Sequence, residues 1–135
     1  YRAWASDITA DETPLQAGLG FCVRDDKEFI GAAALRAADA GGEKPQLRCI
    51  VLADPRSVAL GNEPVRLAGT VVGRVTSGGY GYTVQRSIAY AYVPASVAAG
   101  TAVEIDIFGQ WIGGTVSDEP LYDPSGARMR EPWPS

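Results

Sequence analysis

Residues 69–83 read Gly-Thr-Val-Val-Gly-Arg-Val-Thr-Ser-Gly-Gly-Tyr-Gly-Tyr-Thr, and this stretch decides how the chain folds. Its side chains alternate with a period of two from 70 to 76, which is typical of a β-strand. We expect the chain to reverse at 77–79, because adjacent glycines tolerate positive φ. A second strand-like run over 83–93 completes a predicted β-hairpin.

The glycines and tyrosines around this turn leave two interpretations open. Tyr80 and Tyr82 flank Gly81, so both rings are expected on one side of the turn. The hairpin is either an ordinary part of an all-β core or one wall of a binding site. In the second interpretation Tyr80 is a candidate ligand contact.

The remaining segments predict a mainly β protein. A small antiparallel six-stranded barrel is the preferred fold, and a sandwich is the alternative. A helix is expected over 29–40, where alanine is frequent and Gly41 begins a stop signal. Its small apolar face, formed by Ile30, Ala34 and Ala37, should pack closely against a neighbour. Other expected elements are strands over 19–23, 46–53, 63–67, 101–108 and 111–116, one helical turn at 94–100, and an irregular tail.

Composition narrows the functional classes. The chain has 135 residues, a net charge of −4 and scattered Lys and Arg, so we expect a domain with a real core and no nucleic-acid partner. No apolar run approaches the roughly 18 residues of a membrane-spanning helix. The sequence contains no His, which excludes His-based catalytic triads and His metal ligands within the chain. It starts without Met or a secretory signal, so we expect a fragment or a processed piece.

Cys22 and Cys49 are the two cysteines of the chain. Both lie in apolar, strand-like surroundings, so we expect reduced, buried thiols. This state indicates a cytoplasmic location, because cytosolic proteins keep their thiols reduced. Their spacing does not indicate a zinc site.

The acidic residues do not form a recognisable catalytic pair. Glu104 and Asp106 share one strand face, which is more typical of a solvated surface than of a general acid and base. The charged run 25–28 fits either a surface or the start of the following helix. Lys27 is the cation of that run and is a candidate contact for an anionic ligand. Ser77 does not lie in a nucleophile elbow, and the chain has no His to act as its base. We therefore expect the chain to contribute only part of a larger site.

Six short motifs follow one another along nearly the whole chain: Tyr-Arg-Ala-Trp-Ala-Ser-Asp-Ile-Thr (1–9), Thr-Pro-Leu-Gln-Ala-Gly-Leu-Gly-Phe (13–21), Lys-Glu-Phe-Ile-Gly (27–31), Gly-Asn-Glu-Pro-Val (61–65), Val-Gly-Arg-Val-Thr-Ser-Gly-Gly-Tyr-Gly (72–81) and Pro-Leu-Tyr-Asp-Pro (120–124). Together they resemble the C-terminal part of the glycine-cleavage T-protein (aminomethyltransferase) family. The first and fifth motifs are most similar to the form that is fused to flavin-dependent dimethylglycine and sarcosine dehydrogenases or oxidases.

The resemblance implies a division of the chain. Residues 1–45 would end the family's central folate-binding region, and 46–135 would form its C-terminal β-barrel and tail. In the family, tetrahydrofolate accepts a one-carbon unit from an aminomethyl or iminium donor and becomes methylene-tetrahydrofolate. The catalytic aspartate and a folate-binding glutamate lie before Tyr1, so the resemblance implies a fragment that is inactive alone. Its partners would be upstream domains of the same parent chain, with FAD bound in one of them.

Few of the family's ligand contacts carry over to this sequence. The basic residue before its Phe-Ile-Gly motif corresponds to Lys27, where a cation suits the glutamyl carboxylate of folate. The family's C-terminal tail approaches folate, and Tyr122 or Arg128 would serve here. The family usually has Gly at the position of Ala5, a departure that puts the local turn in doubt.

Three functions therefore remain open. The chain is the C-terminal part of a folate-dependent one-carbon transfer enzyme, a module that only binds folate or a partner, or a scaffold barrel that closes a multidomain fold. Upstream sequence distinguishes them, because a flavin-binding Gly-x-Gly-x-x-Gly motif and the first-domain aspartate would favour the enzyme.

Overall fold

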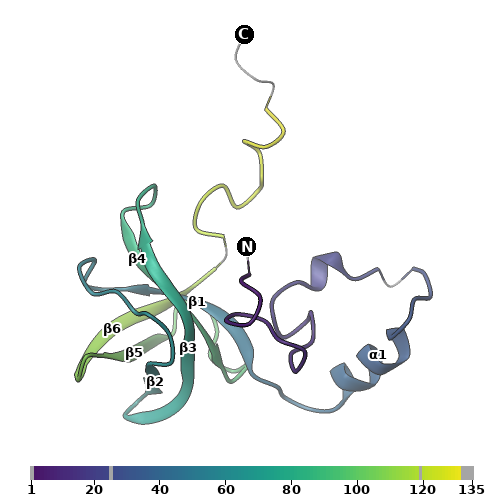
Figure 1. The fold of residues 1–135 in the computed structure, drawn as a ribbon, viewed down its shortest axis with the longest axis horizontal. Helices are drawn as coiled ribbons and strands as arrows, with labels where there is room; N and C mark the ends of the chain where they lie inside the picture. Colours follow the sequence, from purple (N-terminus) through teal and green to yellow (C-terminus); the bar gives the residue numbers. More distant parts are fainter. Residues whose placement is uncertain (1, 25, 119, 132–135) are drawn as a thin grey trace.

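The computed structural model describes residues 2–24, 26–118 and 120–131. It consists of an irregular N-terminal segment with one short helix, a β-barrel and an extended tail (Figure 1). The helices are the 3-10 helix Gly20–Cys22 and α1, Ala32–Ala40. The strands are β1 Gln46–Leu52, β2 Pro64–Leu67, β3 Thr70–Gly81, β4 Arg86–Val93, β5 Ala102–Ile107 and β6 Gln110–Ser117.

The strands close into an antiparallel barrel in the order β1-β4-β3-β2-β5-β6, which confirms the predicted fold. β1 completes the ring by pairing with both β4 and β6. Alternate residues point inward, so that Val103, Ile105 and Ile107 of β5 are buried. Burying one such side chain contributes roughly 1.5–3 kcal/mol. The regular alternation of β5 thus explains both its strand conformation and its place in the core.

The reversal predicted at 77–79 is wrong. β3 continues through these residues, and the chain turns instead at 82–85. Glycine serves a different purpose here, because a Cβ at Gly78 would lie only 2.4 Å from the carbonyl oxygen of Ala59. A glycine inside a strand therefore marks the close approach of another backbone segment.

The strand predicted over 19–23 is also wrong. This stretch forms a single 3-10 turn, whose amides bond to the local carbonyls of Leu19 and Gly20 instead of pairing with a strand. Cys22 is exposed, which corrects the prediction that its thiol is buried. Cys49 in β1 is buried as expected, and both cysteines are free.

Helix α1 begins at Ala32, later than the predicted start at residue 29. Gly31 precedes it with a φ of 94°, a left-handed conformation that glycine adopts without strain. Ile30 is fully exposed and Ala32 is the buried residue of the helix, so the predicted face does not pack against the described part of this chain. Residues 94–100 form hydrogen-bonded turns and not the predicted helical turn.

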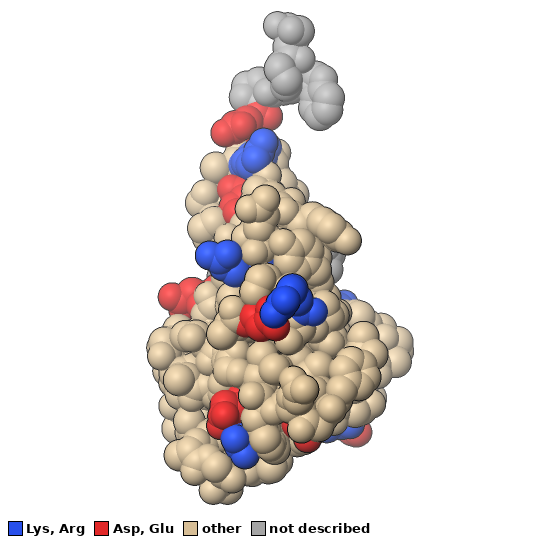
Figure 2. All heavy atoms as spheres, turned by 90° about the vertical axis from the view of Figure 1, so that its left-hand side faces the viewer, with Lys and Arg blue, Asp and Glu red and all other residues tan. Residues whose placement is uncertain are grey.

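The N-terminal segment and α1 lie on one side of the barrel, and the tail extends away from it (Figure 1). The β3–β4 hairpin and the tail point toward the same end of the molecule (Figure 1). On the face drawn in Figure 2, acidic and basic side chains are interspersed. Among the described residues, the helices are too short or too polar to cross a bilayer.

Candidate functional site

A buried carboxylate joins the N-terminal segment to the barrel. Asp7 is only 4% exposed. Its Oδ1 accepts hydrogen bonds from the hydroxyls of Thr76 at 2.7 Å and Ser77 at 2.6 Å, and its Oδ2 accepts one from the amide of Ala3 at 2.9 Å. The phenol of Tyr92 donates to the Asp7 carbonyl at 2.9 Å. Because a buried charge is costly without partners, this network fixes the segment in one position on β3 and β4.

A β-bulge brings the two hydroxyls to the same oxygen. Consecutive residues of a regular strand point to opposite faces, so Thr76 and Ser77 would not both reach Asp7. The register of β3 with β4 slips between Val75 and Ser77. Thr76 is the extra residue, and the bulge turns its side chain toward the side that Ser77 faces.

Hydrogen bonding keeps Asp7 ionised. Burial alone would raise its pKa, but the bonds from Ser77, Ala3 and Thr76, with the positive charge of Arg2, outweigh burial and lower the pKa below its ordinary value. The carboxylate is therefore a charged acceptor at neutral pH. This arrangement supports a role in holding the structure together and is unsuited to a general acid.

Two tyrosines of β4 complete the junction. Tyr90 and Tyr92 alternate with buried residues and share one face of the strand. The guanidinium of Arg2 lies over the Tyr90 ring, 4.8 Å from its centroid, and its Nε donates to the carbonyl of Ala17 at 3.0 Å. Burial, followed by the negative charges of Glu12 and Asp7, raises the pKa of Tyr92 to about 12, so its hydroxyl remains a donor.

The loop that Asp7 closes holds an exposed tryptophan. The carbonyl of Ala3 accepts hydrogen bonds from the amides of Asp7 and Ile8, and the amide of Ala5 donates to the carbonyl of Ile8. Trp4 at the edge of this loop is 71% exposed. Ala5 has a φ of 71°, a left-handed conformation that its Cβ disfavours. The doubt about the turn at this position therefore has a physical basis.

Tyr122 and Arg128, two of the predicted ligand contacts, lie together in the tail. Nη1 of Arg128 donates to the hydroxyl of Tyr122, and the guanidinium lies 5.5 Å from the centre of the ring. Asp123 folds the tail back by accepting hydrogen bonds from the amides of Ala127 and Arg128. The pair is exposed, and its contact with a ligand stays a prediction.

Lys27 stands apart from the tail, in the charged run before α1. Its side chain is exposed. In the same run, Asp26 pairs with Arg24 and Glu28 pairs with Arg36, both at the surface. Gly31 caps α1 without a side-chain bond, so the described part of the run is a surface feature and not a helix cap. Residue 25 lies outside the described residues.

Tyr80 lies near the end of the β3–β4 hairpin. Its ring packs edge-on against that of Tyr82, with centroids 5.1 Å apart and planes at 81°. Tyr82 is mostly exposed, whereas Tyr80 is partly covered. The aromatic pair gives Tyr80 a structural contact, and its contact with a ligand stays a prediction.

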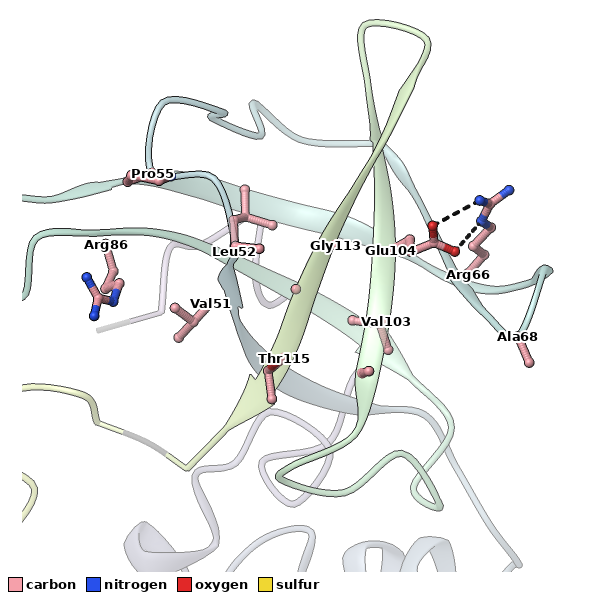
Figure 3. Close-up of a pocket in the computed structure, with 13 residues that line it drawn as sticks. Val51, Leu52, Pro55, Arg66, Ala68, Arg86, Val103, Glu104, Gly113 and Thr115 are labelled. Atoms are coloured by element: carbon pink, nitrogen blue, oxygen red, sulfur yellow. Dashed lines mark hydrogen bonds and ion pairs between the residues drawn. The ribbon is translucent and has the colours of Figure 1, made fainter.

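An open groove of about 750 Å³ is lined mainly by residues of β1, β5 and β6 (Figure 3). Gly113 leaves its floor empty, since a Cβ there would meet no atom within 4 Å. At one end, Glu104 accepts two hydrogen bonds from Arg66, at 2.7 and 3.0 Å, and Arg86 stands at the other end (Figure 3). Glu104 thus forms a surface ion pair instead of a catalytic pair with Asp106. Acidic, Cys and His side chains do not form a metal-binding group within the described ranges.

Comparison with known proteins identifies the family to which the barrel belongs. Residues 46–123 match the family model of the glycine cleavage T-protein C-terminal barrel domain. The chain belongs to this family. It is 38% identical over 136 residues to "Dimethylglycine dehydrogenase, mitochondrial" of Mus musculus, an alignment that covers 97% of this chain and 16% of that protein. It is 39% identical over 122 residues to an aminomethyltransferase of Symbiobacterium thermophilum, covering 88% of this chain and 32% of that protein.

A solved T-protein has the same fold. The crystal structure of the glycine cleavage system aminomethyltransferase T from Bartonella henselae superimposes with a TM-score of 0.82 and 26% sequence identity. The match covers 92% of this chain and 36% of that one. The chain thus spans only 16% to 36% of the length of these longer, multidomain relatives. The predicted cytoplasmic location stays a prediction, and the name of the mouse relative includes the word mitochondrial.

The junction of this T-protein barrel with its N-terminal segment was missed by the sequence predictions. The opening motif includes Asp7 but gives it no role, and the pattern predicts Thr76 at the end of a strand and Ser77 in a turn. One signal was available, because Tyr90 and Tyr92 recur with a period of two among small and apolar residues. That pattern indicates a polar stripe on one face of β4, where another segment can dock.

Proposed function

We propose that the chain is the C-terminal part of a tetrahydrofolate-dependent aminomethyltransferase-like protein and helps it to bind folate. One observation carries the proposal: identity to dimethylglycine dehydrogenase extends over 97% of the chain, so it includes the N-terminal segment as well as the barrel. Residues 1–45 would end the folate-binding region, and 46–135 would form the barrel domain with its tail. The one-carbon donor would be a demethylated amine such as dimethylglycine or sarcosine, or an amine derived from glycine.

The N-terminal segment has a surface suited to upstream domains of the same parent chain. Three large apolar side chains of this segment are strongly exposed: Trp4 at 71%, Phe21 at 84% and Ile30 at 105%. These side chains give the segment apolar surface that an adjoining domain would cover. Because the chain covers only 16% of its dehydrogenase relative, the preceding part of the parent is the natural partner.

The described cations fit the anionic end of folate. Lys27 is exposed, and Arg128 has four N–H groups besides the one that bonds to Tyr122. Carboxylates of a glutamyl tail would pair with these groups through charge-assisted hydrogen bonds. When bound, tetrahydrofolate accepts the one-carbon unit and becomes methylene-tetrahydrofolate. FAD would belong to an upstream domain of the parent, where the amine is oxidised.

Calorimetric titration of the full-length parent with tetrahydrofolate tests this function. We expect the parent to bind and Lys27→Ala to weaken binding by about 1–3 kcal/mol, the value of a charge-assisted hydrogen bond. Lys44→Ala removes the same charge from the connector before β1 and is the matched control. If both variants bind with the affinity of the parent, Lys27 is an ordinary surface charge.

A scaffold role is the second candidate, and one observation favours it. Asp7, the buried carboxylate among the described residues, is bound by structural donors and leaves no free oxygen for chemistry. In that case the barrel only closes a multidomain flavin oxidoreductase. A parent that oxidises its amine but does not bind tetrahydrofolate would establish this role.

A further inference from the structure

We infer that Asp7 is a positioning residue: its hydrogen bonds to β3 set the position of the N-terminal segment, and thereby the affinity of the parent for folate. The inference rests on the proposed function, because it concerns the ligand that this segment would help to bind. Asp7 itself would not touch that ligand, since its carboxylate is buried and occupied by Ala3, Thr76 and Ser77.

Several contacts tie the segment to the barrel, among them the cation–π contact of Arg2 with Tyr90 and a hydrogen bond from the amide of Ser96 to Glu43. Asp7 ties the segment to β3, and farther along the carbonyl of Gln16 accepts a hydrogen bond from the amide of Leu47 at 2.8 Å. The loop closed by Asp7 is the point at which the preceding part of the parent joins this chain. A shift of that loop would therefore move the upstream residues relative to the stretch that carries Lys27.

The chemistry of the junction favours one position over alternatives. An apolar contact tolerates small slips of one segment over another, whereas a buried carboxylate loses stability when any partner is missing. Both hydroxyls reach Oδ1 of Asp7 only because Thr76 is the extra residue of the bulge. The bulge and the carboxylate together thus specify a single register of the N-terminal segment on the barrel.

The test measures the Kd of the full-length parent for tetrahydrofolate by calorimetry, well below the unfolding temperature, alongside the Tm of each variant. Asp7→Asn should raise the Kd about tenfold, the factor that corresponds to about 1.4 kcal/mol of binding free energy lost through misplaced ligand contacts. Ser77→Ala should raise it by a smaller factor. Ser77→Thr keeps the hydroxyl and should retain the wild-type Kd, whereas a role in stability alone would leave the Kd of all three variants unchanged.

Asp54→Asn is the matched control. Its carboxylate also accepts hydrogen bonds from a backbone amide and a serine hydroxyl, but within the loop after β1. It should leave the Kd unchanged. A lower Tm for Asp7→Asn with an unchanged Kd would overturn the inference, and if that variant does not fold, Ser77→Ala decides by the same criterion. A wild-type parent that binds no tetrahydrofolate would instead refute the proposed function, and the inference with it.

Discussion

Ser77 Oγ lies 2.6 Å from Asp7 Oδ1, although 70 positions separate the two residues in the sequence. The bond joins an irregular segment without a core of its own to a closed barrel. Thr76 and Tyr92 reinforce it from the same face of the barrel. The junction therefore behaves as one polar unit, so the stability of the chain depends on the charge state of this unit and on the backbone geometry around it.

Acid should weaken the folded chain through Asp7. Because its folded-state pKa is lowered, its contribution is fully present above the unfolded value of 3.8 and is lost as the pH falls through the folded value. We expect the free energy of unfolding in urea to fall below about pH 4, and to fall less in Asp7→Asn. Identical acid profiles for wild type and Asp7→Asn would contradict the prediction.

Alkaline pH should destabilise the chain through Tyr92. Its pKa is raised from 10.0 to about 12, so the neutral phenol stabilises the fold below pH 10, and this contribution is lost as the pH rises toward 12. Tyr92→Phe should cost about 1 kcal/mol at neutral pH through its lost hydrogen bond, and should flatten the alkaline profile. Urea unfolding at several pH values measures both effects. Tyr82→Phe changes an exposed ring and should retain the wild-type profile.

Two neighbouring glycines of β3 should respond differently to the same substitution. In Gly78→Ala the new methyl group would meet the Ala59 carbonyl at 2.4 Å, so we expect a loss of about 3 kcal/mol or more. In Gly79→Ala the methyl group meets no atom within 4 Å. That variant should unfold within about 1 kcal/mol of wild type. Equal losses of unfolding free energy in urea would show that the backbone of residues 57–60 moves easily to make room for the new methyl group.

Ala5→Gly should stabilise the chain. Ala5 has a φ of 71°, and a left-handed alanine costs roughly 1–2 kcal/mol, of which glycine's greater freedom when unfolded cancels part. We expect a net gain of about 0.5–1 kcal/mol in urea unfolding. Ala3→Gly, in the same loop but without a positive φ, should lose stability. A gain in both variants would indicate that loop flexibility, and not relief of strain, is responsible.

The sequence predicted the fold where local alternation was regular. Val103, Ile105 and Ile107 show a clean period of two, and they form the inner face of β5. Composition and spacing did not reveal that Gly78 faces the backbone of Ala59, because this partner lies in another part of the chain. The adjacent glycines therefore predict a turn, whereas Gly78 in fact allows the close approach of another backbone segment.

The candidate site shows the same limit. Local patterns selected Tyr80 and Lys27, and the family resemblance supported Lys27 and added Tyr122 and Arg128. The structure brings only the last two together. The Asp7 junction depends on a bulge that shifts the register of β3, and a one-residue shift leaves little trace in composition. The Asp7 junction is formed by contacts between distant segments, which local sequence patterns do not predict.

The first and last strands of the barrel lie next to each other, with Cys49 opposite Ser117. A ribosome releases β1 well before β6, so the ring cannot close until synthesis of the barrel is almost complete. Until then one edge of β1 lacks its partner, and an unpaired edge readily joins other strands. Such distant pairings also slow folding. A nascent chain that stops before β6 would therefore be prone to aggregate, whereas one that stops after Ser117 would already hold a closed barrel.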